Sequence, residues 1–284
     1  MNFGGANYFL CFFEGITTMK TTVASFAAMK ASGEKISMLT AYDYSTARMI
    51  DAAGVNAILV GDSLGNVILG YGSTIPVTVD DMIHHGAAVV RGAAEALVVV
   101  DMPFMSYQVS VEEALSNAGR IIKETRCAAL KLEGGKEIAP VVRRLTEAGI
   151  PVMGHVGMMP QHVNVYGGFK VQGKDAAAAE RILEDAKAIE EAGAFAVVLE
   201  CVPAHVAAKA TAMLCIPTIG IGAGPECDGQ VLVNQDMTGM FSDFKPRFVR
   251  RFCDAGSLMR EAYRQFDAAV KAGDFPNEAE TPVR

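Results

Sequence analysis

The stretch LVVV at residues 97–100, followed by DMPF at residues 101–104, combines a continuous apolar run with an acidic residue at its end. A strand with one solvent-facing side alternates apolar and polar residues, and this run does not alternate. Continuous apolar runs rich in β-branched residues are typical of strands buried on both faces, as in a parallel sheet covered by helices. The stretch therefore predicts a parallel α/β fold.

Similar runs occur eight times in the chain, and Ala-rich helical stretches separate most of them. The predicted strands are 36–41, 57–61, 97–100, 129–132, 151–154, 196–199, 217–221 and 230–233. The predicted helices are 45–53 with Ser45 as its cap, 79–93, 111–125, 137–148, 176–192, 205–214 and 245–272. Eight strands favour a (β/α)8 TIM barrel, which typically has about 250 residues. The alternative is a doubly wound open sheet, which usually has a phosphate-binding glycine turn after its first strand, whereas the turn at 42–45 has no glycine.

Composition restricts the classes of protein to which the chain can belong. Of its 284 residues, 51% are hydrophobic and 20% are charged, so a large core can form. The net charge of −7 argues against nucleic-acid binding, which needs a basic surface. The apolar runs have the length of strands, so no membrane span is expected. Six cysteines without a CxxC pair predict reduced thiols in a cytoplasmic protein.

The regular pattern divides the chain into three parts. Residues 1–18 precede a second possible start at Met19, and we interpret them as a dispensable extension, either disordered or a start-site artefact. Residues 19–272 are predicted to form one barrel domain, because no linker or change in composition interrupts them. Residues 273–284 are predicted to be a polar C-terminal tail.

Acidic residues recur where the predicted strands end. Asp62, Asp101 and Glu133 follow the second, third and fourth strands, and Glu200 follows the sixth. The carboxyl ends of all barrel strands meet at one face, where the active sites of such barrels lie. Carboxylates brought together there repel one another, and a divalent cation relieves the repulsion. The sequence therefore predicts a site for a hard cation, Mg²⁺ before Mn²⁺ or Ca²⁺. The alternative is that each acidic residue only caps the helix that follows it.

Two basic side chains are candidates for the same face. Lys131 lies two residues before Glu133 and should share its side of the strand. It could bind a substrate carboxylate, form a Schiff base, or serve as a structural ion pair. His155 ends the fifth strand. It could act as a general acid/base or be a hydrogen-bonded core residue.

Eight motifs in this order resemble those of ketopantoate hydroxymethyltransferases. The motifs are MLTAYD (38–43), VGDSLG (60–65), GYGSTIPVT (70–78), DMPF (101–104), KLEGG (131–135), GHVGMMPQ (154–161), LECVP (199–203) and IGIGAGPECDGQVLV (219–233). The resemblance covers residues 19–270. It implies a (β/α)8 barrel of the phosphoenolpyruvate/pyruvate type, one Mg²⁺ per subunit, and a homo-oligomer, commonly a decamer.

The resemblance also implies roles for individual residues. Asp62 and Asp101 bind the metal, and Glu133 completes the metal site directly or through water. Ser63 and Lys131, together with the two aspartates, contact the 2-oxo acid. Glu200 is the proton acceptor, and His155 is a possible supporting residue.

The reaction implied is transfer of a hydroxymethyl group from 5,10-methylenetetrahydrofolate to 3-methyl-2-oxobutanoate. It passes through a Mg²⁺-stabilised enolate and gives 2-dehydropantoate, in the biosynthesis of pantothenate and coenzyme A. Three alternatives stay open: a Mg²⁺-dependent lyase or mutase, a Schiff-base aldolase, and a non-catalytic barrel protein. Two positions depart from the expected pattern, Gly72 where an aspartate is usual and Asn234-Gln235 where Met-His is usual.

Overall fold

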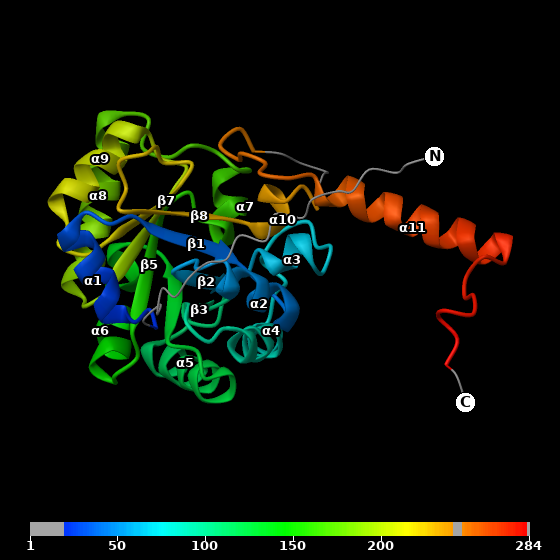
Figure 1. Cartoon of the computed structure of the whole chain (residues 1–284). Coiled ribbons are helices and arrows are strands. Elements are labelled where there is room, and N and C mark those ends of the chain that lie inside the picture. The colour runs from blue at the N-terminus through cyan, green and yellow to red at the C-terminus, as the bar shows by residue number, and fades with distance from the viewer. Residues whose placement is uncertain (1–19, 241–245, 283–284) are drawn as a thin grey trace.

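A computed structural model of the chain describes residues 20–240 and 246–282 (Figure 1). The predicted extension, residues 1–18, lies outside the described residues. So does Lys245, the predicted start of the last helix.

The strands form a closed parallel barrel in sequence order, each paired with its neighbours and β1 with β8, which confirms the predicted fold. They are β1 (Ile36–Thr40), β2 (Ala57–Val60), β3 (Leu97–Asp101), β4 (Ala129–Glu133), β5 (Val152–Gly157), β6 (Ala196–Glu200), β7 (Thr218–Ile221) and β8 (Gly229–Leu232).

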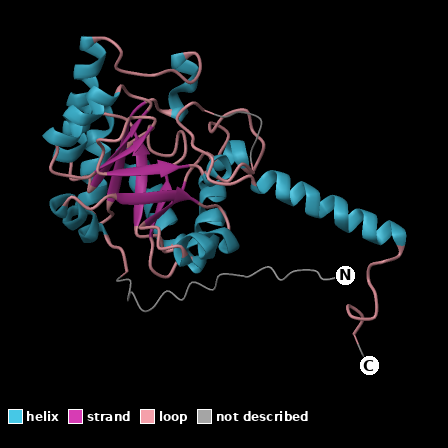
Figure 2. Cartoon of the chain, turned by 45° about the horizontal axis from the view of Figure 1, so that its top comes forward, coloured by secondary structure: helices cyan, strands magenta, loops and turns pink. Residues whose placement is uncertain are grey.

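Helices surround the barrel (Figure 2). They are α1 (Val23–Ser32), α2 (Tyr44–Ala52), α3 (Leu64–Val67), α4 (Val79–Gly92), α5 (Val111–Thr125), α6 (Ala139–Glu147), α7 (Val163–Tyr166), α8 (Ala176–Glu191), α9 (Ala204–Met213), α10 (Asn234–Met237) and α11 (Ala255–Ala272), with the 3-10 turns η1 (Lys136–Ile138) and η2 (Pro160–His162). Within the described residues, no helix is both long and apolar enough to cross a bilayer.

Local side-chain bonds determine where several helices begin. The hydroxyl of Thr78 accepts from Asp81 N, and that of Ser110 accepts from Glu113 N, so both caps lie where the sequence predicts a helix start. The cap of α2 is Asp43 rather than the predicted Ser45, because the Asp43 carboxylate accepts from Thr46 N.

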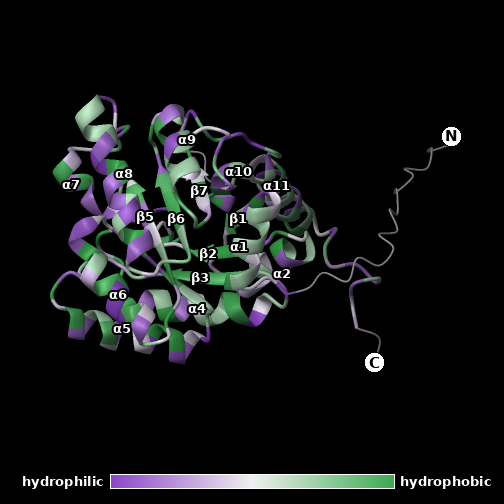
Figure 3. Cartoon of the chain, turned by 90° about the vertical axis from the view of Figure 1, so that its left-hand side faces the viewer, coloured by the Kyte–Doolittle hydropathy of each residue, from purple (hydrophilic) through white to green (hydrophobic). Residues whose placement is uncertain are grey.

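The alternation of side chains along each strand separates two cores. Inward-facing residues such as Met38, Val99 and Met153 form one cluster inside the barrel, joined by Phe26 and Met29 of α1. Outward-facing strand residues pack against the surrounding helices in two further clusters. Figure 3 shows the strands as mainly hydrophobic and the helices as mixed. The inward rows carry the site, because polar residues replace apolar ones at their carboxyl ends.

The last helix differs from the prediction. It begins at Ala255 instead of 245, and residues 246–254 form turns and loop. It also extends away from the barrel (Figures 1 and 2) instead of covering it. Gly256 is its one buried residue.

Candidate active site

The predicted site residues converge at the carboxyl end of the barrel. Asp101 ends β3, Glu133 ends β4 with Lys131 two residues before it, and His155 lies in β5, all of them buried. Strand pairing places Asp101 beside Lys131 and Glu133 beside His155. Each of these residues continues an inward row of its strand, as the period of two requires.

Asp62 and Ser63 come from the turn after β2. Asp62 is 3% exposed, and its backbone N–H donates to Asp101 Oδ2 at 3.0 Å, which joins the ends of β2 and β3. Ser63 Oγ lies 2.8 Å from the hydroxyl of buried Tyr42. A Cβ at position 61 would lie 2.7 Å from Ser63 Oγ, so a larger residue than Gly61 would displace this hydroxyl from Tyr42. The turn therefore presents the carboxylate of Asp62 to the neighbouring strand end.

Burial raises the pKa of both aspartates. It raises the pKa of Asp62 well above its usual range, and the charges of Glu133 and Asp101 add to the rise. Burial also raises the pKa of Asp101, although Lys131 opposes this shift. A cation bound between the two would favour their ionised forms.

Lys131 supplies positive charge to this cluster. Its Nζ lies 3.1 Å from Asp101 Oδ1 and 3.8 Å from Glu133 Oε1. Burial alone would lower the pKa of Lys131, but the carboxylates of Asp101 and Glu133 outweigh burial and raise it. Lys131 therefore stays an ammonium at neutral pH.

His155 lies between two glutamates. Its Nδ1 is 3.4 Å from Glu133 Oε1, and its Nε2 is 3.3 Å from Glu200 Oε2. Burial and the charge of Lys131 act to lower the pKa of His155, but the two glutamates raise it to about 9. The side chain of Glu200 is 16% exposed, so it is the site carboxylate that solvent reaches. The imidazole thus connects the buried carboxylates with Glu200.

The donor set suits a hard divalent cation. Asp101 Oδ1 and Glu133 Oε1 are buried, and among the described residues only the ion pairs with Lys131 and His155 compensate them, without a hydrogen bond. No three His, Cys, Asp or Glu side chains in residues 20–240 and 246–282 are grouped so that they hold a metal by themselves. Mg²⁺ is commonly held by one or two carboxylates plus waters and substrate oxygens, so the Asp62–Asp101 pair fits it. Ligation by Glu133 stays a prediction.

Sequence reasoning assigned no role to three residues that complete the site. Gln161 and Tyr42 belong to quoted motifs, but Gln161 lies beyond the end of its predicted strand, and Tyr42, which follows the first predicted strand, carries no charge. Tyr107, 1% exposed, gives no signal in the sequence, and its hydroxyl lies 2.9 Å from Glu133 O. The two departures from the expected motifs lie outside the carboxylate cluster. Gly72 is exposed. Asn234 is buried, and its backbone N–H donates a hydrogen bond to Thr40 Oγ1.

Known proteins resemble this chain along most of its length. Two relatives are named 3-methyl-2-oxobutanoate hydroxymethyltransferase. That of Clostridium novyi (strain NT) is 58% identical over 92% of this chain and 94% of its own length. That of Syntrophus aciditrophicus (strain SB) is 59% identical over 91% of this chain and 95% of its own length.

Two solved structures share the fold at low sequence identity. A phosphonopyruvate hydrolase, solved in complex with oxalate and Mg²⁺, has a TM-score of 0.61 at 12% identity and covers 93% of this chain and 92% of its own. A 2,3-dimethylmalate lyase of the PEP mutase/isocitrate lyase superfamily has a TM-score of 0.57 at 14% identity, with 93% of both chains covered. A family model described as ketopantoate hydroxymethyltransferase matches residues 20–278. The chain therefore belongs to the ketopantoate hydroxymethyltransferase family.

Proposed function

We propose that this enzyme transfers a hydroxymethyl group from 5,10-methylenetetrahydrofolate to 3-methyl-2-oxobutanoate, giving 2-dehydropantoate for pantothenate biosynthesis. The observation that carries the proposal is the buried Asp62–Asp101 pair beside the ammonium of Lys131, with Glu200 reached through His155. This arrangement combines a cation site, an anchor for a carboxylate and a base. The free thiols of the five cysteines in the described residues support a cytoplasmic location.

Asp62 and Asp101 would hold one Mg²⁺ per subunit, with Glu133 binding it directly or through water. When bound, Mg²⁺ supplies a Lewis acid that polarises the keto oxygen of the 2-oxo acid. Ser63 Oγ and Lys131 Nζ bind and orient the substrate carboxylate. Because Lys131 stays protonated, it acts by its charge and not as the nucleophile of a Schiff-base aldolase.

Glu200 acts as the proton acceptor. It takes the proton from C3 of 3-methyl-2-oxobutanoate, and C3 of the resulting enolate then forms a bond to the methylene carbon of the folate. The two bonds from this carbon to the folate nitrogens break, one water supplies the hydroxyl oxygen, and the C3 proton and one water proton go to the nitrogens of the departing tetrahydrofolate. His155 Nε2 lies 3.3 Å from Glu200 Oε2, and this ion pair positions the carboxylate beside the substrate. The partial exposure of Glu200 lets C3 of the substrate approach it from the mouth of the barrel.

An assay with defined substrates tests this function. With Mg²⁺, 3-methyl-2-oxobutanoate and methylenetetrahydrofolate, we expect 2-dehydropantoate to accumulate, and without the folate we expect none. The product is measured by mass spectrometry. Cleavage of a 2-oxo acid at the same rate without folate would instead indicate a Mg²⁺-dependent lyase.

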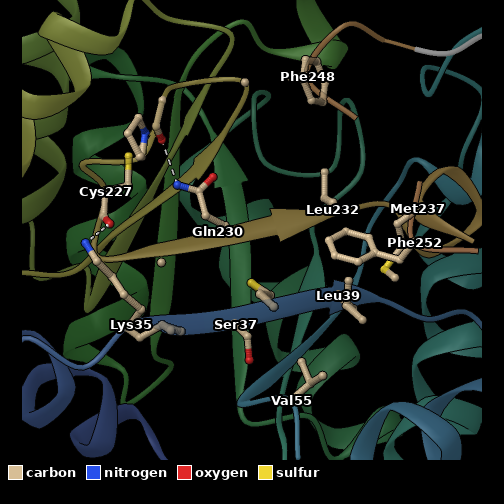
Figure 4. A pocket seen from close by; sticks show the side chains of 16 residues that line it. Lys35, Ser37, Leu39, Val55, Cys227, Gln230, Leu232, Met237, Phe248 and Phe252 are labelled. Atoms are coloured by element: carbon tan, nitrogen blue, oxygen red, sulfur yellow. Dashed lines mark hydrogen bonds between the residues drawn. The ribbon is translucent and has the colours of Figure 1, made fainter. Parts of the chain in front are cut away.

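We also propose a homo-oligomer, in which α11 of one subunit covers the barrel of another. The helix that normally follows β8 in such a barrel belongs to the outer ring. Here the outer face of β1 and β8 has a groove of about 710 Å³ instead (Figure 4). Its lining includes Leu39, Leu232 and the rings of Phe248 and Phe252.

The exposed face of α11 matches this groove in chemistry. Met259, Tyr263, Phe266 and Val270 are exposed and lie at spacings of four, three and four residues, which places them on one side of the helix. A stripe of this kind is normally buried. The groove on a second copy of the chain would bury it. We expect the decamer that the family resemblance implies.

A charged residue placed in the apolar stripe of α11 tests the oligomer. Phe266→Asp places a charge in the apolar stripe, and we expect it to shift the protein to smaller species in analytical ultracentrifugation. Ala268→Asp adds the same charge to the opposite side of α11 and should leave the assembly unchanged. A Phe266→Asp protein with the mass of the parent assembly would contradict the role of α11.

A further inference from the structure

The amide of Gln161 lies at the centre of the site, although no step of the reaction uses it. Gln161 is 3% exposed and belongs to η2, which follows β5. Its side-chain Nε2 donates to Asp62 Oδ2 at 2.9 Å and to the carbonyl of Met102 at 3.0 Å. Its backbone N–H donates to Glu133 Oε2 at 3.0 Å. One residue therefore reaches the loops that follow β2 and β3 and the last residue of β4.

The surroundings of Gln161 determine which way its amide points. Its Oε1 accepts from the hydroxyl of Tyr107 at 2.7 Å and from Gln108 Nε2 at 3.2 Å. The Met102 carbonyl can only accept hydrogen bonds, and the Asp62 carboxylate can only accept them in its ionised form. A flipped amide would place its oxygen against both of these oxygens. The orientation with Nε2 toward Asp62 is thus the one that satisfies every partner.

We propose that Gln161 is a positioning residue for the divalent cation site, holding Asp62 and Glu133 in the orientation that binds the ion. The proposal rests on the metal site described above. Fixing Asp62 Oδ2 by a donor leaves the other carboxylate oxygen to face the site. Outer partners of this kind typically change metal affinity by about 10–100-fold when they are removed.

Gln161→Met provides the test, because methionine keeps the length of the side chain and removes its polar atoms. Binding of Mn²⁺, a divalent probe visible by electron paramagnetic resonance, is measured on the full chain without substrate. We expect the Kd of the variant for Mn²⁺ to rise by about 10–100-fold. Gln108→Met is the matched control: it removes a donor to Gln161 that does not contact Asp62, and its Kd should stay within a few-fold of the parent.

The outcomes separate the positioning role from simple packing and from the metal site itself. If the parent binds Mn²⁺ and Gln161→Met binds it equally well, Gln161 only fills space and the proposal is overturned. A parent without Mn²⁺ binding would overturn the metal site, and the positioning role with it. Should Gln161→Met fail to fold, by circular dichroism, Gln161→Asn keeps the amide but withdraws it by one methylene. The same loss of affinity is expected, and parent-like affinity would again reject the proposal.

Discussion

Asp62→Asn and Asp101→Asn should each abolish tight binding of Mg²⁺ and lower turnover by more than about 100-fold. This loss is larger than the about 10–100-fold that is typical when a residue that only holds a metal ligand is removed. The two carboxylates are 3% and 2% exposed, and the backbone of Asp62 holds Asp101 in place. An amide keeps the shape of the side chain but removes the charge that binds a hard cation. Mg²⁺ binding by calorimetry and formation of 2-dehydropantoate are the two measurements, and both should fall together.

Asp80→Asn is the control for these variants. Asp80 lies on the surface in an ion pair with Arg120, and its side chain is 81% exposed. Loss of this charge should change neither measurement. The affinity for Mg²⁺ in the same calorimetric measurement should also fall as pH falls, because the raised pKa of Asp62 lets protons compete with the ion. Parental activity after exhaustive chelation would contradict the assignment.

Glu200→Gln should lower turnover by about 10²–10⁴-fold, the usual contribution of a positioned acid/base. It should leave Mg²⁺ and 2-oxo acid affinity within a few-fold, because Glu200 contacts His155 and not the aspartates. Exchange of the C3 proton of 3-methyl-2-oxobutanoate with solvent deuterium, followed by nuclear magnetic resonance without folate, isolates the proton transfer. The exchange should slow by the same factor as turnover.

Glu184→Gln repeats the same substitution outside the site. Glu184 is 48% exposed and pairs with Lys136 at the surface, so its exchange rate should match the parent. A Glu200→Gln enzyme that exchanges C3 at the parental rate would remove Glu200 from the role of base. His155, the other titratable group beside it, would then be the next candidate.

Most of the barrel could be predicted from local sequence. The runs AILV and LVVV do not alternate, which predicts strands buried on both faces, and both are fully buried in β2 and β3. The acidic residues at strand ends could be predicted for the same reason: in a parallel barrel the carboxyl ends meet at one face. Lys131 and Glu133 point the same way because they lie two residues apart on one strand.

The sequence alone therefore determined the order of strands, the face that carries the site and the carboxylates that line it, since each depends on a period of two or on the end of one strand. Only the tertiary structure decided the contacts between distant segments. Gln161 meets Asp62 across 99 positions of sequence because the closed barrel brings the loops after β2 and β5 to one mouth. His155 meets both glutamates because β5 pairs with β4 and with β6. The course of α11 was also decided at this level. Its apolar stripe predicts a buried face, but which barrel covers that face depends on packing between surfaces and not on any pattern within the helix.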